Sequence, residues 1–260
     1  MCLNPLSRYI TYQLYHAGIL LGAAAREGKE EQIHQFRVAL RRSRSLVKLY
    51  LDTSVPFPKE LKSAVKATNA IRELDVLIAS INPSKYPETL KTLQQMRGEY
   101  FDDHVTDDFR RSTLESLRRY EDLLCGADPD IPEQELVERV EAHFSSSLDA
   151  YRSISDKTTQ KELHTLRVDF KNARYGFEFL RDEGIAEEAE KIGECKNLQN
   201  ILGEVQDGYN QIEWLEMLYK RRPCGETKKL LKKRKKGLEK LRAASRSVLS
   251  RAARDTRSSG

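Results

Sequence analysis

The sequence lacks the features that mark a secreted, membrane-spanning or zinc-binding protein. Its four cysteines include no CxxC pair, which excludes zinc knuckles and a thioredoxin-type redox motif and argues against a disulfide framework. No apolar run approaches the roughly 20 residues of a spanning helix, and no basic segment precedes the short apolar stretch 17–25. We therefore expect a reduced, cytoplasmic protein with no signal peptide and no membrane insertion.

The common catalytic signatures are also missing. The chain contains no P-loop, no GxSxG nucleophile motif and no HExxH zinc motif. Acids at helical spacing in residues 102–108 could hold a divalent ion, but an exposed acidic helix surface explains them better. We expect no catalytic residue, no cofactor and no metal site.

The net charge of +5 is unevenly distributed. Lys and Arg crowd the segment after residue 220, whereas residues 1–219 hold more acidic than basic side chains. Global charge therefore cannot draw an anion to the body of the protein, so anion binding depends on where individual basic residues lie. The basic tail fits either a solvated amphipathic helix or a weak, non-specific contact with nucleic acid.

The composition is that of a helical protein. Between the eight prolines lie long stretches rich in Leu, Ala, Glu, Lys and Arg, with apolar residues at three- and four-residue spacing and no convincing period-2 strand. We predict an all-α fold. The expected helices span residues 6–26, 30–53, 59–81, 88–124 (with a break near Asp103 as an alternative), 133–153, 159–183, 186–206, 209–221 and 226–255.

The two halves of the chain resemble each other. Residues 34–44, HQFRVALRRSR, align without gaps on residues 164–174, HTLRVDFKNAR. A second segment follows in each half, IRELDV in the first and LGEVQD in the second. Internal duplication explains both matches. We expect one domain spanning residues 1–260, made of two repeats, 1–125 and 133–255, separated by the Pro- and Gly-containing segment 126–132.

Each repeated helix should carry a basic stripe beside its apolar face. At about 100° per residue, the histidine and the three basic residues that follow it share an arc of about 80°. Like charges at this spacing repel, and a bound anion would relieve the repulsion. The planar donor fork of arginine suits phosphate. The candidate ligand-binding residues are His34, Arg37, Arg41, Arg44, Lys48, His164, Arg167, Lys171 and Arg174.

Other interpretations of these residues stay open at this point. A basic helix face is most often simply solvated. Each histidine could be a phosphate donor, a buried structural residue or a general acid, and neighbouring arginines disfavour its imidazolium form. Asp75 and Asp207, in the second segments, could each fix an arginine rotamer, cap a helix or bind a metal.

The linked motifs resemble those of the CHAD family, the conserved histidine α-helical domain, over about residues 5–250. The resemblance rests on residues 34–45, 72–76, 163–179 and 202–207, and it departs from the family at Glu73, where Asp is usual. It implies an all-α fold of two pseudo-symmetric bundles around a basic channel, and binding of inorganic polyphosphate without catalysis. Arg72, Asp75 and Asp207 would then support the binding residues.

The partners expected from this reading are polyphosphate and polyphosphate granules. Non-specific nucleic-acid binding and a His-dependent phosphohydrolase are the alternatives. The chain shows no CYTH triphosphatase domain, which often accompanies CHAD.

Overall fold

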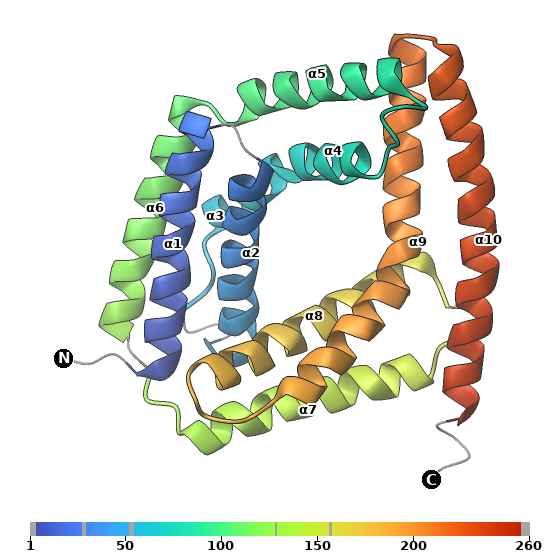
Figure 1. Ribbon diagram of the computed structural model, residues 1–260. Helices are drawn as coiled ribbons and strands as arrows, with labels where there is room; N and C mark the ends of the chain where they lie inside the picture. Colours follow the sequence, from blue (N-terminus) through green and yellow to red (C-terminus); the bar gives the residue numbers. More distant parts are fainter. Residues whose placement is uncertain (1–3, 28–29, 52–54, 128, 156–157, 256–260) are drawn as a thin grey trace. The chain divides into compact units, whose positions relative to one another are not determined.

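The computed structural model describes residues 4–27, 30–51, 55–127, 129–155 and 158–255 (Figure 1). Within these residues every regular element is helical, which confirms the predicted all-α fold. The elements are α1 (Pro5–Glu27), α2 (Glu30–Leu46), the π-helix η1 (Val47–Leu51), α3 (Lys59–Ala67), α4 (Asn69–Ala79), α5 (Pro87–His104), α6 (Asp107–Ala127), α7 (Glu133–Arg152), α8 (Gln160–Asp182), α9 (Ala189–Arg221) and α10 (Gly225–Asp255).

The chain divides into two compact units, and neither unit is continuous in sequence. Unit 1 comprises Met1–Ile81, Leu90–Leu136 and Asp182–Ile185. Unit 2 comprises Asn82–Thr89, Val137–Arg181 and Ala186–Gly260. The helix break expected at 126–132 is present between α6 and α7, but the chain passes from one unit to the other at several other points.

Two short segments, Asn82–Thr89 and Asp182–Ile185, belong to a different unit from the residues on either side of them in the sequence, and we call them the exchanged segments. Specific hydrogen bonds hold each of them in its unit. In unit 2, Glu226 of α10 accepts hydrogen bonds from the backbone N–H groups of Glu88 and Thr89, at 3.1 and 3.3 Å. In unit 1, the Tyr9 hydroxyl of α1 donates to a carboxylate oxygen of Asp182, at 3.0 Å. Each segment therefore belongs to its unit through side-chain contacts as well as proximity.

Unit 1 is built around α1, which contacts both α2 and α6 (Figure 1). The apolar face predicted for α2 is confirmed, since Ile33, Phe36 and Leu40 are fully buried. Tyr120 of α6 is buried among these helices, and its hydroxyl donates to the Val55 carbonyl at 3.0 Å. The core fixes which face of α2 remains available to solvent.

Unit 2 has an aromatic core between α7 and α8. Phe170 and Phe177 of α8 are fully buried, and the ring of Phe144 meets both edge-on, with centroids 6.3 and 5.4 Å away. α9 and α10 lie side by side in the same unit (Figure 1). The core rings orient α8 so that its basic residues lie beside the buried face.

Four predicted helices differ from the structure. The expected helix 30–53 changes to a π-helix at Val47. The expected helix 59–81 is interrupted at Thr68, and the expected separate helices 186–206 and 209–221 form one continuous α9. Gly208 lies within α9, where its missing side chain makes room for Leu238 of α10, whose Cδ1 lies 2.9 Å from where a Cβ would be.

Candidate functional site

The basic residues of α2 and η1 form a stripe beside the buried face of α2. We define the α2 basic stripe as His34, Arg41, Arg44 and Lys48. Arg44 and Lys48 are exposed, whereas His34 and Arg41 are half-buried. Lys48 lies in the π-helix, where the wider turn changes its angular position from the one that a continuous α-helix would give. The stripe therefore has solvent access along its length, as a ligand-binding surface requires.

His34 lies in strongly cationic surroundings. Its pKa is lowered from the ordinary value of 6.5, first by burial and then by the positive charge of Arg72. Arg41 and Arg37 lower the pKa further, and Glu31 opposes them. The imidazole is therefore neutral at pH 7 and can donate one ring N–H to an acceptor.

Arg72, which was expected to support the site, brings a further cation to the stripe from α4. Its Nη1 lies 3.2 Å from Oε1 of Glu30, at the first residue of α2. Both side chains are partly exposed, so the ion pair is worth little and its carboxylate is readily exchanged for another anion. The Glu30 carboxylate therefore shows where, beside the stripe, Arg72 can pair with a negatively charged group.

Arg37 departs from the expectation that every basic residue of the pattern reaches the ligand. It is 2% exposed, and its Nη1 donates to the Val65 carbonyl and, at 2.7 Å, to the Thr68 hydroxyl. Its Nη2 donates to Oδ1 of Asn69 at 2.5 Å. Burial, followed by the charge of Arg41, lowers the pKa of Arg37 to about 9. This arginine satisfies the polar groups where α3 ends and α4 begins, which accounts for the interruption of the helix predicted over 59–81.

Asp75 holds an arginine, as one interpretation of it predicted, although not an arginine of the stripe. It is 3% exposed, and its Oδ1 accepts a hydrogen bond from Nε of Arg97 on α5 at 2.9 Å. The Arg97 guanidinium also lies over the ring of Phe101, 5.2 Å from its centroid. This pair joins α4 to α5 within unit 1. Asp207 differs, since it is exposed and its carboxylate has no hydrogen bond or ion pair among the described residues.

The second repeat places its basic residues on α8. We define the α8 basic stripe as His164, Arg167, Lys171 and Arg174. His164 is exposed and the other three are half-buried. Lys171 and Arg174 both lie over the ring of Tyr175, 5.8 and 4.9 Å from its centroid. Arg174 also lies 3.7 Å from the buried carboxylate of Glu178, so it is partly neutralised within its own helix.

Arg167 lies against the backbone of α9. The closest point is Gly203, where a Cβ would lie 2.9 Å from the Arg167 Nε. That Nε is buried and has no hydrogen-bond partner among the described residues. The aligned residue of the first repeat, Arg37, is instead bound by three acceptors, so sequence equivalence does not give the two arginines the same environment.

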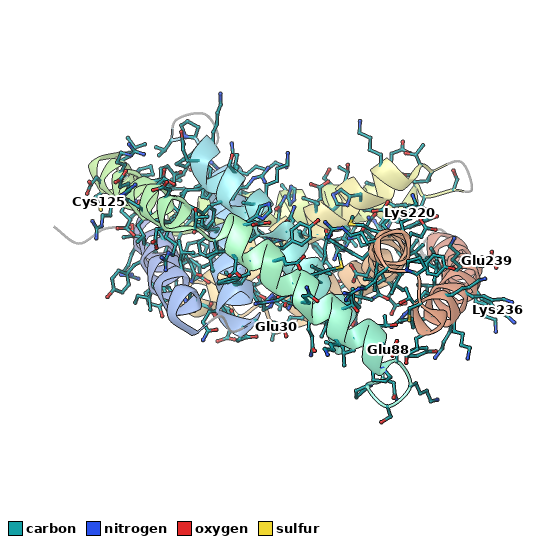
Figure 2. The ribbon with its side chains drawn as sticks, turned by 90° about the horizontal axis from the view of Figure 1, so that it is seen from above. Glu30, Glu88, Cys125, Lys220, Lys236 and Glu239 are labelled. Atoms are coloured by element: carbon teal, nitrogen blue, oxygen red, sulfur yellow. The ribbon has the colours of Figure 1, made fainter. Side chains whose placement is uncertain are left out.

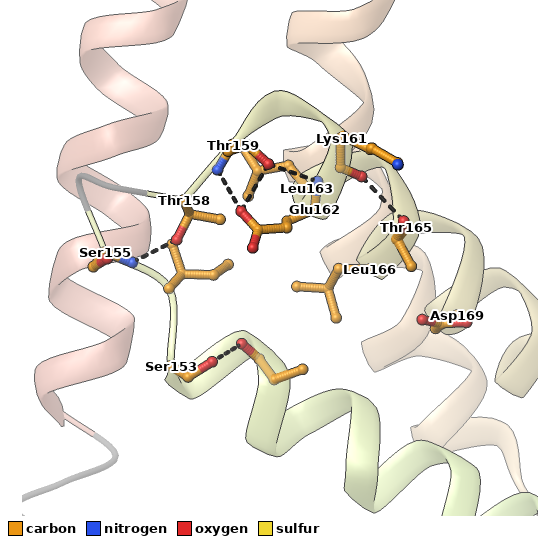
Figure 3. A pocket seen from close by; sticks show the side chains of 12 residues that line it. Ser153, Ser155, Thr158, Thr159, Lys161, Glu162, Leu163, Thr165, Leu166 and Asp169 are labelled. Atoms are coloured by element: carbon orange, nitrogen blue, oxygen red, sulfur yellow. Dashed lines mark hydrogen bonds between the residues drawn. The ribbon is translucent and has the colours of Figure 1, made fainter.

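A pocket of about 750 Å³ lies between the end of α7 and the start of α8 (Figure 3). Hydroxyl groups, among them those of Ser153 and Thr159, line it together with the carboxylates of Glu162 and Asp169. Glu162 accepts hydrogen bonds from the Thr159 N–H and hydroxyl at 2.6 and 2.7 Å, and these bonds lower its pKa. Ionised carboxylates repel a polyanion, and the α8 basic stripe is not part of the lining, so this pocket is not the expected site.

The basic tail forms the exposed side of α10. We define the α10 lysine face as Lys229, Lys232, Lys233, Lys236 and Lys240. These lysines are all exposed and fall within about 100° of the helix circumference, with the buried Leu238 opposite them and the buried Leu230 at their flank. Figure 2 shows Lys236 at the surface of α10. The leucines confirm an amphipathic helix, and the lysine face is its solvated side.

No group of three or more His, Cys, Asp or Glu side chains within the described residues could hold a metal ion. Two of the acids of residues 102–108, Asp107 and Asp108, pair instead with Arg110 and Arg111. No described helix is long and apolar enough to cross a membrane.

Comparison with known proteins identifies the family. A model of the CHAD domain matches residues 16–216, which is most of the chain. The chain belongs to the CHAD domain family. Among solved structures, this CHAD chain is similar to the crystal structure of the CHAD domain from the plant Ricinus communis, with a TM-score of 0.77 and 19% sequence identity. The match covers 96% of this chain and 90% of that one, and at this identity it shows the fold alone. No curated protein matches the sequence.

Two features of this CHAD chain were not recognised from its sequence. Arg97, the partner of Asp75, belongs to no repeated motif, so no pattern distinguished it from other helical arginines. Gly203 did carry a signal, because it stands in the segment LGEVQD, but its contact with Arg167 depends on how α9 packs on α8.

Proposed function

We propose that this CHAD chain binds inorganic polyphosphate, without catalysis, through the α2 and α8 basic stripes. The observation that carries the proposal is that each stripe gathers a histidine and several solvent-accessible cations along one helix face. The same residues make up the motifs by which the sequence resembles the family, and polyphosphate is the ligand that this resemblance implies. Binding would associate the protein with polyphosphate granules in the cytoplasm.

The chemistry of the stripes favours a chain of phosphates over a nucleic acid. Guanidinium and ammonium groups recognise phosphate oxygens, whereas single-stranded bases are recognised by stacking on accessible aromatic faces. The aromatic ring within the α8 basic stripe, Tyr175, is 3% exposed and lies beneath Lys171 and Arg174. It therefore supports the cations and offers no face to a base.

The histidines act in this proposal as neutral donors. His34 has a lowered pKa, which suits hydrogen-bond donation to a phosphate oxygen at neutral pH. The competing hypothesis is a phosphohydrolase that uses one of these histidines. Incubation with polyphosphate, with and without Mg²⁺, should release no phosphate above that of a chain with both histidines replaced by Gln.

The binding test compares two variants that lose the same charge. The stripe variant replaces Arg41, Arg44, Arg167 and Lys171 with Ala, and the control variant replaces Lys229, Lys232, Lys233 and Lys236 of the α10 lysine face. Charge-assisted hydrogen bonds are worth about 1.5–3 kcal/mol each, so even with strong non-additivity the stripe variant should bind long-chain polyphosphate at least about 100-fold more weakly. The control should lose about threefold or less, because its lysines are exposed and screened.

Two further measurements separate the ligand classes. Polyphosphate should displace single-stranded RNA at equal phosphate concentration, and long chains should bind more tightly than triphosphate, since a long chain can engage several cations at once. If the control variant loses more affinity than the stripe variant, the binding element is α10. If RNA displaces polyphosphate, nucleic-acid binding becomes the primary function.

A further inference from the structure

We propose that Gly203 is a positioning residue for Arg167: its missing side chain allows the guanidinium to lie on the α9 backbone, where it is held ready for a phosphate group. The inference rests on the proposed function and deepens it, because it assigns a role to a residue that bears no charge. It also explains why the second repeat carries a glycine within a long helix, where glycine is unfavourable.

The distances define how closely the two residues approach. A Cβ on Gly203 would lie 2.9 Å from Nε of Arg167, 3.3 Å from its Nη2 and 3.4 Å from its Cζ. The Arg167 Nε is therefore closer than a Cβ at this position would tolerate, and two further guanidinium atoms would be in contact with it. Gly203 is itself buried in the interface between α8 and α9, so a side chain there has no open route to solvent.

The Arg167 guanidinium is held in place while its Nη donors stay available for hydrogen bonds. Its Nε is buried and lacks a partner among the described residues, whereas neither Nη is buried without a partner. No ion pair or hydrogen bond of Arg167 to another described residue engages the Nη groups, so they remain available at the surface. Phosphate binds arginine through paired N–H groups, and a fixed guanidinium loses less entropy on binding than a freely rotating one.

The aligned arginine of the first repeat supports the same reasoning by contrast. Arg37 is fixed by hydrogen bonds from its Nη groups to Val65, Thr68 and Asn69, although its Nε, like that of Arg167, is buried without a partner among the described residues. Arg167 is fixed by shape, so its donors are left for the ligand. The contact with Gly203 therefore orders the Arg167 guanidinium and leaves it able to bind an anion.

Two other glycines of α9 supply matched controls. A Cβ on Gly193 would meet nothing within 4 Å, so Gly193→Ala adds the same methyl to the same helix without a contact. A Cβ on Gly208 would meet the core residue Leu238 at 2.9 Å, so Gly208→Ala strains packing away from Arg167. The three substitutions separate the effect on the guanidinium from effects on the helix and the core.

The experiment measures polyphosphate affinity in a double-mutant cycle on the full chain. Arg167→Ala should weaken binding roughly 10- to 100-fold, and Gly203→Ala should weaken it at least about threefold. The double variant should bind no more weakly than Arg167→Ala alone, because the methyl acts only through the guanidinium. Gly193→Ala should stay within about twofold of the unchanged chain.

A second measurement follows the geometry without a ligand. Gly203→Ala displaces the Arg167 guanidinium, whose Nη groups reach the surface, and adds a good helix former, so its Tm should not fall. The Arg167 Nε–H signal in an NMR spectrum should shift, and its proton should exchange faster with solvent, in Gly203→Ala but not in Gly193→Ala.

Each unfavourable outcome points to a distinct failure. If the unchanged chain does not bind polyphosphate, both the proposed function and this inference are overturned. If it binds and Arg167→Ala or Gly203→Ala binds equally well, the inference alone is overturned. The inference is also overturned if Gly203→Ala weakens binding as much in the Arg167→Ala background as it does alone.

Discussion

Replacing Arg37 with Ala should lower the free energy of unfolding of the protein. Removing an exposed cation of the α2 basic stripe should not. The Arg37→Ala change removes one donor to the Val65 carbonyl and the donor to the buried Thr68 hydroxyl oxygen. The Val65 carbonyl keeps the Thr68 hydroxyl as a donor at 3.1 Å, so the Thr68 oxygen is the acceptor left without one, at a cost of about 1–3 kcal/mol. Asn69 is exposed and can turn to water, so its lost bond adds little.

The cost of burying the Arg37 charge reduces this loss of stability. Burial lowers the pKa of Arg37 to about 9, which means that the folded protein keeps this charge at a cost that Ala would relieve. We therefore expect the free energy of unfolding to fall by about 1–2 kcal/mol, toward the lower part of the range from the Thr68 acceptor alone.

Urea denaturation followed by circular dichroism provides the measurement. The matched control is Arg44→Ala, which removes the same charge from the same helix at an exposed position and should change the free energy of unfolding by about 0.5 kcal/mol or less. The reasoning is refuted if the two variants are equally stable. If Arg37→Ala were then also to bind polyphosphate much more weakly, Arg37 would be a ligand residue, as the sequence pattern alone predicts.

Three further results are expected. Polyphosphate affinity should rise over the pH range in which His34 takes up a proton, because the bound anion favours the imidazolium over the neutral form present at pH 7, and this rise should shrink in His34→Gln. Without ligand, the lowered pKa of His34 means that the unfolded chain takes up the proton first, so stability should decline as the pH falls through 6.5, less so in the variant. Asp75→Asn should lower the free energy of unfolding by about 2–3 kcal/mol, because Arg97 loses a buried counter-charge, and a change under about 0.5 kcal/mol in chemical denaturation would contradict the role of the pair. Gly208→Ala should lower the Tm relative to Gly193→Ala, since its methyl presses on Leu238, and an equal Tm would show that α10 simply shifts.

The helical fold follows from the sequence because its main signals are local. The spacing of Ile33, Phe36 and Leu40 predicts which face of α2 is buried, and the structure agrees. The break at Thr68 could not be predicted in this way, because it depends on Arg37, a residue that is distant in sequence and reaches the end of α3 through tertiary packing. The predicted gap between residues 206 and 209 is wrong for a related reason, because Gly208 in that gap marks a close helix contact, which sequence does not distinguish from a helix end.

For the candidate site too, the sequence predicts what depends on local helix geometry and misses what depends on tertiary packing. The angular position of a basic residue follows from helix periodicity, so the pattern correctly groups Arg41 with Arg44 on one stripe. Whether a given arginine reaches solvent depends on its neighbours, and periodicity carries no information about them. Arg37 and Arg167 occupy equivalent places in the repeated motif, yet one satisfies a helix end and the other rests on a glycine.

The exchanged segments of the two units have a consequence for how the protein could be divided. Asn82–Thr89 comes from the first half of the chain but belongs to unit 2, and Asp182–Ile185 comes from the second half but belongs to unit 1. A cut in the loop between α6 and α7 would leave each fragment without a segment that the other fragment carries. The two fragments should therefore fold poorly when expressed singly and should recover structure when mixed, because each unit needs a segment from both halves of the chain.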